Sequence, residues 1–256
     1  MQRTEKDVVA RLRAAGCVFA EDEARLIMGA ARDGAELSRL VDRRVAGLPL
    51  EQVIGWAAFL GLRIAVGPGV FVPRRRTEFL VRQAVTGTRP GDVVLDLCCG
   101  SGAIGAAIAA AVPGVDLHAA DADPVAVRCA RRNLAPVAGR VYEGDLYAPL
   151  PPALRGTVTV LTANVPYVPT AEIALLPAEA RDHEPRAALD GGADGLDVLR
   201  RVAARAGEWL APGGRLLMET TERQAAPATG VLSGHGLAAR VVSDPEAGAT
   251  VVVATR

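Results

Sequence analysis

The chain has 256 residues, of which 50% are hydrophobic and 23% are charged, a composition with room for one α/β domain and a small accessory domain. Lysine plus arginine equals aspartate plus glutamate at 29 each, so no overall charge attracts the protein to nucleic acid or to an anionic membrane. We see no signal-peptide pattern and no apolar run of membrane-spanning length, and we therefore expect a cytoplasmic protein. The four cysteines have no CxxC spacing, which argues against a disulfide framework or a metal site.

Apolar residues recur at helical spacing through residues 1–50, with breaks near Gly16 and Gly34. This pattern predicts about three short helices, which are too small to hold a large core alone. We expect them to form a helical domain that either stabilises the fold or recognises the substrate. Residues 51–72 contain short, glycine-punctuated apolar runs that predict a β-hairpin linker.

The third segment, residues 73–256, begins with PRRRTEFLV, in which Pro73 ends any preceding element and Thr77 and Glu78 begin a helix. Three consecutive arginines are compatible with a solvated turn or with the wall of a cleft between domains.

Residues Asp96 to Gly105 read DLCCGSGAIG and follow an apolar run, which predicts a buried strand, a tight turn and a helix. Gly100 and Gly102 allow positive φ and a close approach of the backbone to a ligand. The spacing Gly100-x-Gly102-x-x-Gly105 fits the dinucleotide fingerprint. Asp96-x-x-x-Gly100-x-Gly102 fits the first motif of methyltransferases that use S-adenosylmethionine. Both interpretations are open at this stretch.

The rest of the chain alternates strand and helix patterns, which predicts a doubly wound, mostly parallel α/β sheet with ligands at the carboxyl ends of its strands. Asp121 ends the second strand, where a carboxylate can accept hydrogen bonds from both ribose hydroxyls of an adenosine cofactor. Asp145 follows the third strand, where an adenine amino group could bind. Residues 168–194 form a long irregular stretch and a candidate lid. The predicted strands of this sheet span residues 93–95, 115–120, 140–142, 158–163, 215–220, 237–242 and 250–254.

The turn Asn164-Val165-Pro166-Tyr167 after the fourth strand favours methyl transfer to a planar nitrogen. The lone pair of an amide or aromatic amine is delocalised and weakly nucleophilic. Two acceptors, the Asn164 side-chain oxygen and the Val165 carbonyl, could bind both N–H groups and aim the lone pair at a methyl group. Pro166 stiffens the turn, and Tyr167 offers an aromatic face for stacking.

With these motifs, nearly the whole chain resembles the HemK-like protein glutamine-N5 methyltransferases, which modify the Gly-Gly-Gln loop of peptide-chain release factors. The most specific match is EPRAALDGGADGLD, residues 184–197. The resemblance implies a seven-stranded class I (Rossmann-like) methyltransferase domain, S-adenosylmethionine as cofactor, a release factor or paralogous protein as partner, and no contact with membrane or specific nucleic acid. It also makes residues 1–50 a release-factor-binding domain. The cofactor residues that it implies are Asp96, Cys98, Gly100, Gly102, Asp121, Asp145 and Asn164, and the catalytic residues are Asn164, Val165, Pro166 and Tyr167.

The sequence departs from the family pattern at three places. Val165 replaces the first proline of Asn-Pro-Pro-Tyr but keeps its carbonyl. Arg75 and Arg76 stand where proline and an acidic residue are usual, and Glu219-Thr-Thr replaces Glu-Ile-Gly. The last two changes bear on the protein substrate more than on the reaction. The remaining alternatives are a nucleic-acid amino-methyltransferase, a nicotinamide-dependent oxidoreductase and a cofactor-binding module without activity.

Overall fold

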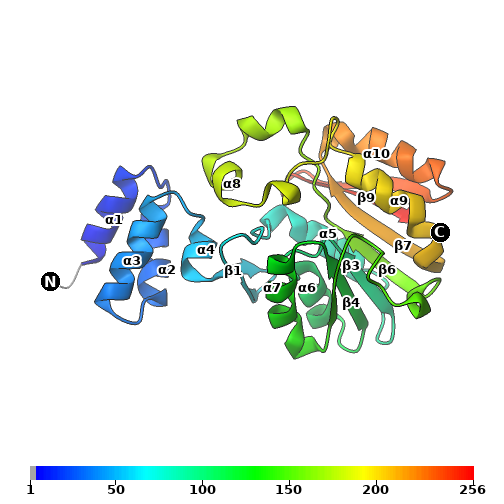
Figure 1. The fold of residues 1–256 in the computed structure, drawn as a ribbon, viewed down its shortest axis with the longest axis horizontal. Coiled ribbons are helices and arrows are strands. Elements are labelled where there is room, and N and C mark those ends of the chain that lie inside the picture. Colours follow the sequence, from blue (N-terminus) through cyan, green and yellow to red (C-terminus); the bar gives the residue numbers. More distant parts are fainter. Residues whose placement is uncertain (1–3) are drawn as a thin grey trace.

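The computed structural model describes residues 4–256, and its N-terminal part is a small helical unit (Figure 1). Thr4 caps the first helix by accepting a hydrogen bond from the backbone N–H of Asp7, whose carboxylate accepts in return from the Thr4 backbone. The helices bury their apolar stripes against one another in a core of their own. They are α1 (Glu5–Ala14), α2 (Ala20–Ala30), α3 (Gly34–Val45) and α4 (Leu50–Ile54).

A β-hairpin links this unit to the larger domain. Strands β1 (Trp56–Phe59) and β2 (Leu62–Ala65) pair antiparallel. Asn133 holds the hairpin against the domain: its side chain accepts a hydrogen bond from the Ala65 N–H at 2.9 Å and donates to the Ala65 carbonyl at 2.9 Å. The hairpin therefore has a fixed place beside the larger domain.

The larger domain is built on a seven-stranded sheet with the order β5-β4-β3-β6-β7-β9-β8. The five strands from β5 to β7 are parallel; β9 pairs antiparallel with β7, and the edge strand β8 pairs antiparallel with β9. The reversal between β3 and β6 places the carboxyl ends of these two strands at a switch point, where ligands of open α/β sheets bind. The strands are β3 (Val93–Leu97), β4 (Asp116–Asp121), β5 (Arg140–Glu143), β6 (Val158–Ala163), β7 (Leu210–Thr220), β8 (Ala238–Asp244) and β9 (Ala249–Thr255).

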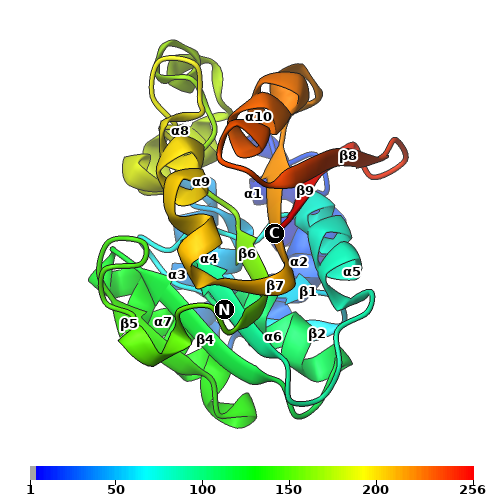
Figure 2. The same ribbon diagram turned by 90° about the vertical axis from the view of Figure 1, so that its right-hand side faces the viewer.

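Helices cover both faces of this sheet (Figure 2). Apolar residues of α5 (Glu78–Val85), α6 (Ala103–Ala111) and α7 (Pro124–Leu134) pack on one face, and those of α9 (Asp197–Trp209) and α10 (Glu222–Gly234) pack on the other. Strand β3 is buried on both sides, which explains its continuous apolar run.

The predicted fold class, a seven-stranded α/β domain with an N-terminal helical unit and a hairpin, is confirmed. Helix α10 is not predicted from the sequence, because its low amphipathicity and internal Pro227 hide its helical pattern. The stretch expected to be irregular contains α8 (Ala178–His183) and short 3-10 turns. Within residues 4–256, every helix is too short or too polar to cross a membrane.

Candidate active site

A cavity of about 550 Å³ opens at the carboxyl ends of the parallel strands. The loops that follow β3, β4, β5 and β6 form its floor, and the α8 segment and the stretch after the hairpin form its walls. The segments that line it are distant in sequence, and the sheet brings them together at one edge. The predicted residues that line this cavity are Cys98, Gly100, Asp121, Asp145, Asn164, Val165, Pro166 and Tyr167.

The glycine loop after β3 takes a left-handed backbone at three positions, with φ of 53° at Cys98, 54° at Gly100 and 77° at Gly102. A Cβ on Gly100 would meet nothing within 4 Å, so this residue leaves open space for a ligand. A Cβ on Gly102 would lie 3.1 Å from Leu134 and 3.3 Å from Ala130. Gly102 therefore allows α6 to pack against α7, and it is not among the residues that line the cavity.

Asp96 lies beneath this loop and also does not line the cavity. Its side chain is fully buried, with one oxygen accepting from Thr162 Oγ1 at 2.9 Å and the other from the Gly105 N–H at 3.2 Å. Burial raises the pKa of Asp96 to about 7. Asp96 and Gly102, both expected to contact the cofactor, instead support the loop from behind, whereas Cys98 and Gly100 line the cavity.

Asp121 ends β4 at the cavity and organises the loops around it. One carboxylate oxygen accepts from the Gly100 N–H at 2.8 Å and the other from the Asp123 N–H at 2.9 Å. A carboxylate has about four acceptor positions, so both oxygens can still receive a hydroxyl. Burial raises the pKa of Asp121. Asp145 faces the same cavity and forms an ion pair with Arg201, which an adenine amino group would have to share.

The turn after β6 places an unpartnered hydrogen-bond acceptor at the cavity. Asn164 Oδ1 is buried and has no hydrogen-bond partner within residues 4–256. An unsatisfied buried acceptor costs about 1–3 kcal/mol, which is expected where a ligand supplies the missing donor. The Val165 side chain is buried in the core, which leaves the backbone carbonyl as the group that this residue could offer to a substrate. The space at Gly100, the acceptors of Asp121 and the free oxygen of Asn164 together fit an adenosine cofactor beside an N–H-bearing substrate.

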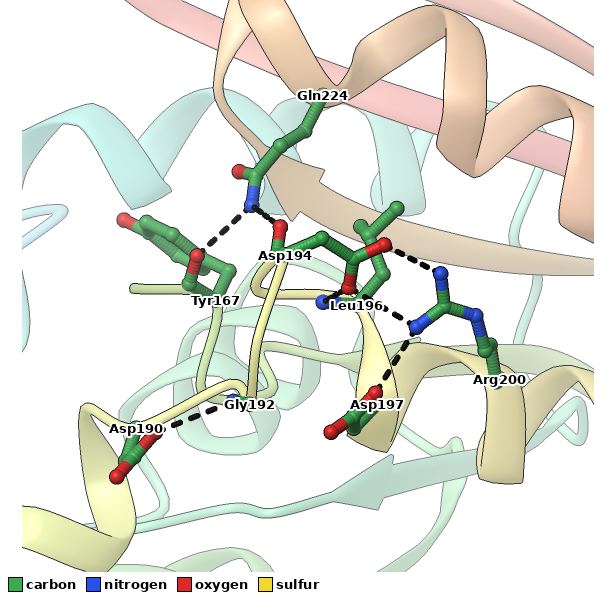
Figure 3. A network of polar contacts seen from close by, with 8 residues as sticks. All are labelled: Tyr167, Asp190, Gly192, Asp194, Leu196, Asp197, Arg200 and Gln224. Atoms are coloured by element: carbon green, nitrogen blue, oxygen red, sulfur yellow. Dashed lines mark hydrogen bonds and ion pairs between the residues drawn. The ribbon is translucent and has the colours of Figure 1, made fainter. Parts of the chain in front are cut away.

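The glycine-rich segment at residues 190–197 fixes this turn from behind (Figure 3). Gln224 Nε2 donates to the Tyr167 carbonyl and to the Asp194 carbonyl, each at 2.9 Å. A Cβ on Gly195 would stand 2.2 Å from the Tyr167 carbonyl oxygen, and one on Gly191 would stand 2.7 Å from that of Pro166. Only glycine allows the two backbones to approach this closely. The segment therefore supports the Asn164 turn.

The α8 wall is tied to both domains by ion pairs. Arg44 of α3 is buried, donates to Glu23 at 2.6 Å and reaches Glu179 of α8 at the same distance. Glu184, also buried, pairs with Arg74 and accepts from the Val72 N–H at 3.2 Å. The wall of the cavity thus depends on residues of the helical unit and of the stretch after the hairpin.

Two contacts at the edge of the cavity could not be predicted from the sequence. Gln224 lies on α10, which has no clear helical pattern in the sequence. Arg76, expected as a reversed charge on the cleft wall, does line the cavity, but its guanidinium is paired with the buried carboxylate of Glu219. The long sequence separation between these partners leaves no local signal for either contact.

Comparison with known proteins agrees with this geometry. The methyltransferase small domain model matches residues 61–169. The release factor glutamine methyltransferase of Geobacter sulfurreducens is 39% identical over 199 residues, which cover 77% of this chain and 69% of that protein. The 4-amino-L-phenylalanine/4-methylamino-L-phenylalanine methyltransferase of Streptomyces pristinaespiralis is 34% identical over 213 residues, covering 80% and 72%. Among solved structures, a methyltransferase from Pyrococcus furiosus shares the fold, with a TM-score of 0.57 and 18% identity over 76% of this chain and 88% of that one.

Proposed function

Because this chain belongs to the release factor glutamine methyltransferase family, we propose that it methylates the side-chain amide nitrogen of a glutamine in a protein loop. The substrate that we propose is the Gly-Gly-Gln loop of a peptide-chain release factor. The methyl donor is S-adenosylmethionine, and the family membership decides against the oxidoreductase interpretation of the glycine loop.

The observation that carries this proposal is the unpartnered Oδ1 of Asn164 at the cavity. A primary amide has two N–H groups, and the turn offers the Asn164 oxygen for one and the Val165 carbonyl for the other. With both N–H groups held, the lone pair of the nitrogen is aimed rather than free to rotate away. The turn then acts by positioning and electrostatics and supplies no strong base.

Tyr167 completes the acceptor site. Burial raises the pKa of Tyr167 to about 12, so its phenol is neutral at physiological pH. A neutral aromatic ring offers a face on which the planar amide can pack. We assign Pro166 the role of holding the turn rigid between these two residues.

Asp121 and Gly100 would hold the cofactor. Asp121 would accept hydrogen bonds from its ribose hydroxyls, and Gly100, which has no side chain, would let it lie close to the backbone of the loop. When bound, S-adenosylmethionine supplies an electrophilic methyl group. We propose Cys98, Asp145 and Asn164 as further cofactor contacts because all three line the same cavity.

We propose residues 1–50 as the part that recognises the protein substrate. The exposed Val18 and Phe19 of this unit, at 83% and 69% of their full accessible area, support a docking role. A release factor acts in translation, so the proposal also implies a cytoplasmic enzyme with a protein partner.

A second candidate is methylation of an aromatic amine on a small molecule. It is favoured by the similarity to the 4-amino-L-phenylalanine methyltransferase, since an aniline nitrogen also has two N–H groups and a delocalised lone pair. The two candidates differ in the size of the acceptor and in the need for the helical unit.

The deciding experiment measures transfer of labelled methyl from S-adenosylmethionine to three acceptors: purified release factor, a Gly-Gly-Gln peptide and 4-aminophenylalanine. The proposal expects one methyl on the glutamine nitrogen of the release factor, located by mass spectrometry. Methylation of the aromatic amine alone, with the release factor untouched, would overturn it in favour of the second candidate.

A further inference from the structure

The phenol of Tyr167 belongs to a closed triangle of polar contacts with Arg76 and Glu219. Arg76 Nη2 donates to the Tyr167 oxygen at 2.6 Å, and that hydroxyl donates to Glu219 Oε1 at 3.0 Å. Arg76 Nε donates to the same Glu219 oxygen at 3.0 Å. Each of the three groups therefore contacts both of the others.

The three side chains come from different elements at the edge of the cavity. Arg76 lies in the 3-10 turn Arg75–Thr77, Tyr167 follows β6, and Glu219 stands near the end of β7. Glu219 is only 2% exposed in its side chain, whereas that of Arg76 is 46% exposed. A buried carboxylate needs a cation and hydrogen-bond donors to offset its desolvation. Arg76 supplies the cation from the solvent side, through Glu219 Oε1, and reaches across to the phenol, while Glu219 Oε2 is buried without a hydrogen-bond partner within residues 4–256.

The triangle restricts the tyrosine more than a single hydrogen bond could. The phenol oxygen accepts from one fixed group and donates to another, so the tip of the side chain is held in place, and with it the direction in which the ring extends from the backbone. The carbonyl of the same residue is held by Gln224. Tyr167, which lines the same cavity as Asn164, is thus anchored at both its backbone and the tip of its side chain.

From this geometry we infer that Arg76 is a positioning residue for methyl transfer, acting through the phenol of Tyr167 to hold the aromatic face against which the acceptor group packs. The inference rests on the proposed function, because it assigns Tyr167 a place beside the acceptor. It also explains how a cation is accommodated where an acidic side chain is usual in the family: the charge is paired internally with Glu219 and does not act as a free charge toward the substrate.

Single-turnover methyl transfer tests the inference in Arg76→Met, Tyr167→Phe and the double variant. The expected result is a loss of about 10- to 100-fold in rate for each single variant, as for other small misplacements of a positioned group, with unchanged affinity for S-adenosylhomocysteine. The double variant should lose no more than the single variants, because the arginine acts only through the phenol oxygen. Multiplied losses in the double variant would overturn the inference.

Two further variants separate positioning from charge balance. If Arg76 served only to neutralise Glu219, Arg76→Met combined with Glu219→Gln would restore the wild-type rate, and that recovery would refute the inference. Arg75→Met is the matched control, since Arg75 is an exposed neighbour that does not line the cavity. It should transfer methyl at the wild-type rate.

A spectroscopic readout keeps the test independent of the substrate. The chain has three tyrosines, so fluorotyrosine labelling gives three ¹⁹F resonances, and the one lost in Tyr167→Phe belongs to Tyr167. Arg76→Met should shift or broaden that resonance and leave the other two unchanged. An unaltered Tyr167 resonance would refute the inference even if no acceptor were methylated, whereas an altered resonance in an enzyme that leaves glutamine untouched would refute the proposed function alone.

Discussion

Replacing Asn164 by alanine tests the site most directly. The variant removes an oxygen that is buried and has no partner within residues 4–256, so it breaks no hydrogen bond of that oxygen in the free protein. The substitution should therefore leave the fold intact, and its effect on the rate should appear only when the acceptor amide is bound. Removal of one positioned hydrogen-bond partner in a water-excluded site costs about 10²–10³ in rate, or about 3–4 kcal/mol.

The assay is single-turnover methyl transfer to a glutamine-containing acceptor, with cofactor affinity measured by calorimetry on the same preparations. Asn164→Asp keeps an acceptor oxygen, so a pure acceptor role predicts a rate well above that of the alanine variant. Equal, low rates for both variants would mean that the amide N–H₂ is also required. A wild-type rate for Asn164→Ala would refute the assignment of the turn to the acceptor amide and reduce it to a structural feature.

Three further predictions concern Asp121 at the end of β4, Gly195 behind the Asn164 turn and Asp96 beneath the glycine loop. Asp121→Ala should weaken cofactor binding by about 1–3 kcal/mol, and calorimetry showing unchanged affinity would remove its proposed role. Gly195→Ala forces a Cβ to within 2.2 Å of the Tyr167 carbonyl oxygen and should lower both the melting temperature and the rate, whereas Gly230→Ala, with nothing within 4 Å, should lower neither. The raised pKa of Asp96, about 7, means that the folded state binds this proton more tightly than the unfolded chain. The free energy of unfolding of the wild type should therefore fall relative to that of Asp96→Asn as pH rises from about 4 to about 7, by up to about 1.4 kcal/mol per pH unit. Urea denaturation measures both free energies, and a difference between the two proteins that stays constant over this pH range would contradict the prediction.

The sheet and the cavity floor could be predicted because their signals are local. The run before Asp96, the proline after Asp123 and the acidic end of β4 each define an element boundary within a few residues. Helix α10 gave no such signal, because Pro227 and a weak apolar stripe conceal it. Gln224, which lies on it, was missed for the same reason.

The division between ligand contacts and supports could not be read from the motif. Asp96 and Gly102 stand in the same ten-residue stretch as Gly100, but they face Thr162, α6 and α7 rather than the cavity. Spacing shows that a turn is present and does not show which side of it faces a ligand. The partnership of Arg76 with Glu219 spans 143 residues and depends on the order of strands in the sheet.

The ion pair between Arg44 and Glu179 has a practical consequence for dissecting this enzyme. A fragment that begins at residue 73 would lose the partner of Glu179 and the backbone N–H of Val72 that binds Glu184. Its cavity wall would be altered even for a small acceptor that never touches the helices. Inactivity of such a fragment would therefore mix two causes, damaged architecture and lost recognition. Substitution of Phe19, which is exposed on the helical unit, separates them, since Phe19→Ser should reduce activity on a protein acceptor and spare activity on a short peptide.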